Sequence, residues 1–171
     1  MIPASPGGCM SRSASYDDDV FLWSAEQARL IRALKAGRRD LPNALDLDNI
    51  AEEIESVGRS DLHTVQSLLV QIFAHLIKLA DRGLGHGSAE HWSAEILALQ
   101  RQIHRRCTPG MRQHIDLQAL WQDAREDAAQ LADLAGAPEP ASGETCPFSL
   151  DDMRDTAFSI RAAVDRIRPP A

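Results

Sequence analysis

Residues 45–58 read LDLDNIAEEIESVG and carry the clearest helical pattern in the chain. Their apolar side chains recur every three or four residues, which places them on one stripe of a helix: Leu47, Ile50, Ala51, Ile54 and Val57. Asp48, Glu52 and Glu55 share the opposite side, and Glu53 lies at the edge of the apolar stripe. The stretch therefore predicts an amphipathic helix whose acidic side is either a solvated surface or a binding site.

The segment that follows, residues 62–80, carries the widest apolar stripe. Its members are Leu62, Val65, Leu68, Leu69, Ile72, Phe73, Leu76, Ile77, Leu79 and Ala80. A stripe this broad predicts a helix packed on two or more sides, hence a central one. Gly58-Arg59-Ser60 predicts a break or a bend before it. The polar residues Gln71, His75 and Lys78 interrupt the apolar run, which favours a core helix over a membrane span.

Four further helices are expected on both sides of these two. The first opens at Asp17 and ends at Gly37, and the next begins at Ser88. The third runs from Pro109 to Gly136, and the last covers 150–167. The inner side expected for the first helix consists of Val20, Trp23, Gln27, Leu30, Ile31 and Leu34. A capping box of Ser149 and Asp152 opens the last helix. Its heptad stripe is either an oligomer seam or a part of the core.

No strand pattern competes with these helices, and the connections between them are short. The sequence therefore predicts an all-α fold: a helical bundle of about six helices, mostly antiparallel, around a single core. Residues 1–15 are expected to form a disordered tail, and residues 16–171 a single helical domain.

The composition excludes several classes of protein. The chain has 171 residues, 44% of them hydrophobic and 25% charged, with a net charge of −7. This balance is typical of a globular protein and disfavours indiscriminate binding to nucleic acid or anionic lipid. The first residues lack the basic start and apolar run of a secretory signal. Cys9, Cys107 and Cys146 form no C-x-x-C pair, which favours a reduced, cytoplasmic location.

Three stretches in order also carry a family resemblance: 16–33 (YDDDVFLWSAEQARLIRA), 45–63 (LDLDNIAEEIESVGRSDLH) and 68–79 (LLVQIFAHLIKL). They resemble the bacterial family called domain of unknown function DUF29 over nearly the whole chain after the tail. The matched positions are Tyr16, Asp19, Trp23, Gln27, Asn49, Glu52, Glu53, Glu55, Gly58, His75 and Lys78. The chain departs from the family pattern at Leu79, in residues 81–91 and around Pro42. The resemblance implies a helical bundle and no established activity.

Glu53 is the acidic residue of 45–58 that should be partly buried. A buried carboxylate needs a partner, so we expect Glu53 to pair with His75, Lys78 or Arg101 and to be less exposed than its acidic neighbours. Such a pair, with Glu52 beside it, would set the angle between two helices rather than perform chemistry.

The run RQIHRRCTPGMRQH, residues 101–114, contains four arginines and no acid: Arg101, Arg105, Arg106 and Arg112. Arginines near the C-terminus of a helix interact favourably with the helix dipole, and this explains most of the cluster. The alternative is an electropositive patch for RNA or an acidic partner.

The spacing closest to that of a metal site is His86, His91 and Glu95, with the last two at i and i+4. Tetrahedral zinc needs three or four such ligands, and no fourth is evident. No E-x-x-H pattern, P-loop or nucleotide-binding glycine motif occurs, and no cofactor is expected.

These patterns favour a cytoplasmic protein-interaction or regulatory module without catalytic activity. It would bind an unidentified protein partner or a second copy of itself, and no membrane. Two alternatives stay open. One is a metal-dependent enzyme that uses Glu52, Glu53, His75 or the His86/His91/Glu95 group. The other is nucleic-acid binding through residues 101–114, which the net charge disfavours.

Overall fold

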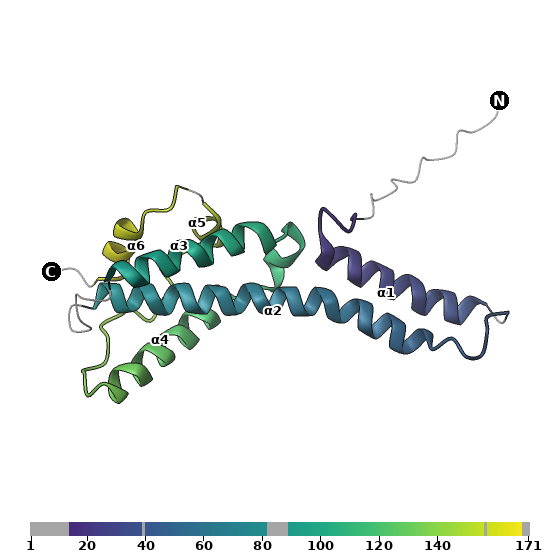
Figure 1. Cartoon of the computed structure of the whole chain (residues 1–171), viewed down its shortest axis with the longest axis horizontal. Helices are drawn as coiled ribbons and strands as arrows, with labels where there is room; N and C mark the ends of the chain where they lie inside the picture. Colours follow the sequence, from purple (N-terminus) through teal and green to yellow (C-terminus); the bar gives the residue numbers. More distant parts are fainter. Residues whose placement is uncertain (1–13, 39, 82–88, 156, 169–171) are drawn as a thin grey trace, which may run out of the picture. The chain divides into compact units, whose positions relative to one another are not determined.

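The structure is a computed structural model that describes residues 14–38, 40–81, 89–155 and 157–168 (Figure 1). This part of the chain is helical and contains no strand, which confirms the all-α prediction. Its elements are α1 (Val20–Gly37), α2 (Leu47–Ala80), α3 (Ala89–Arg106), the 3-10 helix η2 (Pro109–His114), α4 (Leu117–Leu134), α5 (Leu150–Arg154) and α6 (Ile160–Ile167). Residues 1–13 of the predicted tail, with Cys9, lie outside the described residues, as do Ser88 and His86.

The chain divides into two compact units, Met1–Gly58 (unit 1) and Arg59–Ala171 (unit 2). Helix α2 runs through the boundary and contributes its first turns to unit 1 and its remaining turns to unit 2. The single domain expected for residues 16–171 stays a prediction, because compactness alone does not decide whether two units that share a helix unfold together.

Unit 1 is a hairpin in which small residues bring α1 close to α2. Ser24 and Ala28 are buried on α1, and Ala51 is buried on α2. A Cβ atom added at Gly58 would lie 2.3 Å from Ser24 Oγ and 3.2 Å from Phe21 Cα. A larger residue here would require the Ser24 hydroxyl to move and would crowd the backbone of α1 at Phe21. The predicted break at Gly58-Arg59-Ser60 is therefore wrong, because this glycine permits a close helix contact within a continuous α2.

The inner side predicted for α1 is wrong at two of its six residues, Leu30 and Leu34, whereas the other four are half-buried: Val20, Trp23, Gln27 and Ile31. Leu30 is 44% exposed and Leu34 is 41% exposed, whereas Ser24 and Ala28 form the contact. The close approach of the helices leaves room only for small side chains between them, so the leucines lie beside the contact. The helix also begins later than predicted, at Val20, because Asp19 caps it by accepting from the Leu22 amide at 3.1 Å.

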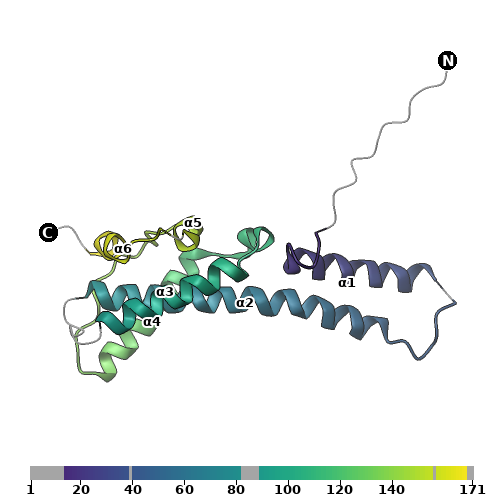
Figure 2. The same ribbon diagram turned by 45° about the horizontal axis from the view of Figure 1, so that its top comes forward.

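Unit 2 surrounds the C-terminal half of α2, as predicted. Seven large apolar side chains of this half are buried: Val65, Leu68, Leu69, Ile72, Phe73, Leu76 and Ile77. Ile96, Leu99 and Ile103 of α3 are buried as well, as are Trp121 of α4 and Met153 of α5. Figures 1 and 2 show these helices gathered along α2.

An aromatic cluster joins α2 and α4 to the segment before α5. Phe73 meets Trp121 edge to face with ring centroids 5.6 Å apart, and it stacks on Phe148 at 5.7 Å. By length and composition α2 would pass for a membrane-spanning helix, as core helices of globular domains also do. Its apolar side in unit 2 is covered by these neighbours.

Two predicted helices of unit 2 are each divided in the structure. The helix expected at 109–136 is η2 followed by α4, because Asp116 caps α4 by accepting from the amides of Gln118 and Ala119. The helix expected at 150–167 is α5 followed by α6, and Ser159 caps the latter. Ala163, Val164 and Ile167 of α6 are buried. This burial favours the core over an oligomer seam for the C-terminal stripe.

Candidate functional site

The four arginines of residues 101–114 divide into two kinds. Arg106 lies 3.2 Å from Asp61 of α2. Arg112 pairs with Asp151 of α5 and holds the pKa of that carboxyl below its usual value. These two arginines connect elements of unit 2. Arg101 and Arg105 are exposed, one turn apart on α3, and pair with no carboxylate in the described part of the chain.

Arg101 and Arg105 line a groove between α3 and α5 with a volume of about 320 Å³. Its lining residues are Leu97, Gln100, Arg101, His104, Arg105, Met153, Arg154 and Asp155. Met153 is buried, and Leu97 is exposed at the surface of α3. The groove thus combines an apolar floor with three guanidinium groups.

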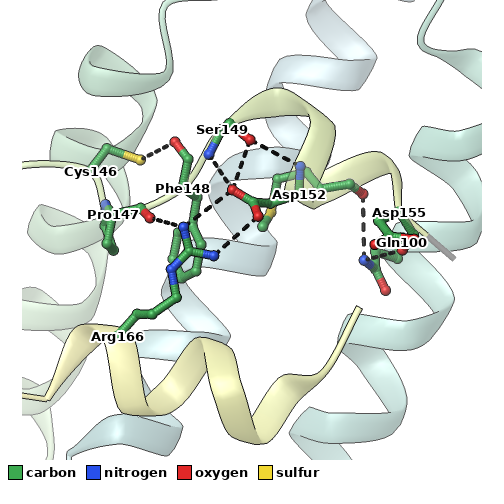
Figure 3. A network of polar contacts seen from close by, with 9 residues as sticks. Gln100, Cys146, Pro147, Phe148, Ser149, Asp152, Asp155 and Arg166 are labelled. Atoms are coloured by element: carbon green, nitrogen blue, oxygen red, sulfur yellow. Dashed lines mark hydrogen bonds and ion pairs between the residues drawn. The ribbon is translucent and has the colours of Figure 1, made fainter. Parts of the chain in front are cut away.

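Polar contacts from α3 fix the α5 wall of this groove. Gln100 is buried, and its amide nitrogen lies 3.5 Å from the Met153 carbonyl and 3.4 Å from the Asp155 carbonyl (Figure 3). His104 Nδ1 lies 3.3 Å from the Arg154 carbonyl and donates to it in the tautomer that carries the proton there. These contacts satisfy carbonyls at the end of α5, which a five-residue helix leaves unpaired.

The other end of α5 is held by Asp152. Its carboxylate accepts from the Ser149 amide at 2.7 Å in the predicted capping box, and Arg166 of α6 lies 3.1 Å away (Figure 3). The Arg166 hydrogen bond, with those of Ser149, lowers the pKa of Asp152 to about 2. Arg166 also lies 4.9 Å from the centroid of the Phe148 ring. Helix α5 is therefore anchored to α6 and to the aromatic cluster.

Arg154 also lines the groove, and one nitrogen of its guanidinium group lacks a hydrogen-bond partner among the described residues. Its Nε atom is buried and has no hydrogen-bond partner in the described part of the chain. A buried donor without a partner is destabilising. Guanidinium groups bind carboxylates through paired hydrogen bonds. The groove therefore has the chemistry to hold an anionic ligand with an apolar portion.

His75 and Lys78 belong to a different groove, between α2 and α4, with a volume of about 330 Å³. Burial, and next the nearby Lys78, lowers the pKa of His75. Burial also lowers the pKa of Lys78, although the charge of Asp127 on α4 opposes this. Leu131 and Leu134 of α4 line the same groove. The structure therefore separates these two candidates from Arg101 and Arg105.

The expectation for Glu53 is wrong. Glu53 is exposed, and Glu55 is the less exposed of the two. Its expected partner His75 lies about six turns further along α2, in the part of the helix that belongs to unit 2. The acids on the opposite side of α2 are the paired ones: Arg32 of α1 lies 2.6 Å from Glu55 and 3.5 Å from Glu52, and Lys35 pairs with Asp48.

The predicted metal ligands do not form a site among the described residues. His91 and Glu95 are exposed and 4.0 Å apart on one turn of α3. No group of three or more histidine, cysteine, aspartate or glutamate side chains suited to a metal occurs in the part of the chain that is described. His86 lies outside it. Both His91 and Glu95 act electrostatically on His75, a proximity that the sequence did not predict.

Sequence reasoning found Arg101 and Arg105 but missed the other wall of their groove. Arg154 and Met153 were assigned to an unbroken last helix, and Gln100 was not singled out. The one available signal was polar Gln100 between the apolar residues Leu99 and Ile103 of α3. Nothing in the sequence connects that position to α5, 53 residues away.

The comparisons with known proteins agree with this architecture. A solved structure of an alpha-helical protein of unknown function from Rhodospirillum rubrum superimposes with a TM-score of 0.83 at 34% sequence identity. The match covers 91% of this chain and 99% of that one. No curated protein matches the chain. The family model for the domain of unknown function DUF29 matches residues 15–159. The chain is therefore a member of the DUF29 family.

Proposed function

We propose that this protein is an interaction module whose groove between α3 and α5 binds an acidic, partly apolar segment of a partner protein. The observation that carries the proposal is the placement of Arg101 and Arg105. They are the two arginines of residues 101–114 that have no described ion pair, and both line the groove. The proposed setting is the cytoplasm, and the proposed role is binding rather than catalysis.

The lining favours a peptide over a nucleic acid. No phenylalanine, tyrosine or tryptophan lines the groove, and its one aromatic ring, that of His104, is engaged with the Arg154 carbonyl, so the groove lacks the usual platform for base stacking. Leu97, which is 42% exposed, supplies an apolar contact that suits an aliphatic side chain. The net charge of −7 opposes a polyanion but affects a short acidic segment much less. Salt bridges from Arg101 and Arg105 would supply the specificity for carboxylates.

The test is selection from a phage-displayed random peptide library on the immobilised protein, followed by fluorescence anisotropy with the enriched peptides. The proposal predicts acidic sequences with at least one aliphatic residue. The double variant Arg101→Glu/Arg105→Glu should weaken their binding by about tenfold or more, because two charge-assisted contacts become repulsive.

The matched control is Arg161→Glu, an exposed arginine on α6 outside the groove, which should bind the peptides as the wild type does. Enrichment of basic peptides, or equal binding by the double variant, would contradict the proposal. Tighter binding of a single-stranded RNA oligonucleotide than of any selected peptide would instead favour the nucleic-acid alternative.

A further inference from the structure

Unit 1 buries little apolar surface for the number of large apolar side chains that it carries. Among its described residues, the buried apolar side chains are Ala28, Leu47 and Ala51, two of them alanines. Seven large apolar side chains are exposed: Tyr16, Leu22, Leu30, Leu34, Leu45, Ile50 and Val57. A pair of helices becomes stable when such a surface packs against a second layer.

Four of these seven residues lie on one side of the hairpin: Leu30, Leu34, Ile50 and Val57. Successive helical residues are about 100° apart. On α1, Leu30 and Leu34 therefore lie on the side of the helix contact that is away from Arg32. On α2, Ile50 and Val57 lie away from Asp48 and Glu52 in the same way. Because α1 and α2 run antiparallel as a hairpin, the two apolar rows flank one side of their contact.

The opposite side of the hairpin is closed by the ion pairs of Arg32 with Glu52 and Glu55 and of Lys35 with Asp48. The hairpin thus has a charged face and an apolar face. We call the second the hairpin face, defined by Leu30, Leu34, Ile50 and Val57.

We propose that the hairpin face is a dimer interface that packs against the same face of a second copy of this chain. Two such hairpins would form a four-helix arrangement with the leucines, Ile50 and Val57 inside. A two-fold axis requires a self-complementary surface. The hairpin face meets this requirement, since its apolar rows carry no charge, and Glu26 at its border is paired with Arg29 of the same helix.

The available area matches what a small dimer needs. Helix α1 has 18 residues, so it is about 27 Å long, and two adjacent helices are about 20 Å wide. The hairpin face therefore offers about 500 Å² on each copy, or about 1,000 Å² in total. This equals the lower bound for a specific interface.

The test is the molar mass of the full chain in solution, measured by sedimentation equilibrium over a range of concentrations. The wild type should have twice the chain mass of 18.8 kDa. The double variant Leu30→Glu/Leu34→Glu should have the mass of a single chain. The matched control is Leu134→Glu on α4, because that leucine is 83% exposed and belongs to unit 2. The control should remain a dimer.

If the double variant loses its fold, hydrogen–deuterium exchange of the wild type provides an independent test of the interface. On dilution below the dissociation constant, protection should fall in α1 and in residues 47–57, and it should persist in residues 65–77. A wild type of single-chain mass throughout, a double variant that stays dimeric, or a loss of protection confined to unit 2 would each overturn the proposal. The first result would leave the face to another occupant, and the last would place the interface in unit 2.

Discussion

Asp152 shows how one carboxylate positions a wall of the candidate site. It closes the capping box with Ser149 and accepts from Arg166, which in turn lies over Phe148. The capping box follows from the spacing of Ser149 and Asp152 and was predicted from the sequence. The contact with Arg166, 14 residues later, was not, because it depends on the break between α5 and α6.

Because the pKa of Asp152 is about 2, we expect the free energy of unfolding to depend on pH in the acidic range. Its folded pKa lies below the ordinary 3.8, so ionised Asp152 stabilises the fold above about pH 5, and this contribution is lost as the pH falls toward 2. Asp152→Asn should therefore lower the free energy of unfolding by about 1 kcal/mol at pH 7. The difference from the wild type should shrink below pH 4.

Urea denaturation from pH 7 to pH 2.5 measures this effect. Asp165→Asn is the matched control, because that exposed aspartate of α6 lies 3.6 Å from Arg168 and should change stability by less than about 0.5 kcal/mol. A difference for Asp152→Asn that is constant over the whole pH range would contradict the account.

At the scale of the elements, the sequence indicated which segments are helical more reliably than how they pack. The stripe of residues 62–80 correctly predicted the central helix, because its width reflects burial on several sides. The inner side of α1 was predicted from its large apolar residues, whereas the contact uses Ser24, Ala28 and Gly58. Small residues give no apolar stripe, so a close helix contact is hard to recognise from periodicity.

Gly58→Ala tests this close contact. Alanine favours a helix by about 1 kcal/mol, but its Cβ would lie 2.3 Å from Ser24 Oγ. Since overpacking costs about 1–3 kcal/mol, we expect a net loss of about 1 kcal/mol in the free energy of unfolding. Replacing Ser24 with alanine as well should recover part of that loss.

The double-mutant cycle is measured by chemical denaturation followed by far-UV circular dichroism. Gly37→Ala is the control, because a Cβ at that position meets no atom within 4 Å. If Gly58→Ala stabilises the protein as a simple helix-propensity change would, the close contact does not constrain unit 1.

At the scale of the whole molecule, the two units differ in what they bury and what they expose. Unit 2 has a full core around α2. Its groove between α3 and α5 contains Arg101 and Arg105, which have no described ion pair. Unit 1 has a thin contact of small residues and an apolar face. The sequence placed Arg101 and Arg105 in a candidate patch, but the groove needs α5, whose position depends on tertiary contacts. The sequence did not reveal the hairpin face, because Leu30 and Leu34 were assigned to the inner side of the first helix.

The central claim is that the groove between α3 and α5 binds an acidic segment, and chemical-shift mapping tests it most directly. A ¹⁵N-labelled sample of the full chain would be titrated with an acidic peptide selected on the wild type. We expect the largest shift changes in residues 97–105 and 153–155, and we expect Arg101→Glu/Arg105→Glu to reduce them strongly at the same peptide concentration. Largest changes at His75, Lys78 and Leu131, or in unit 1, would contradict it.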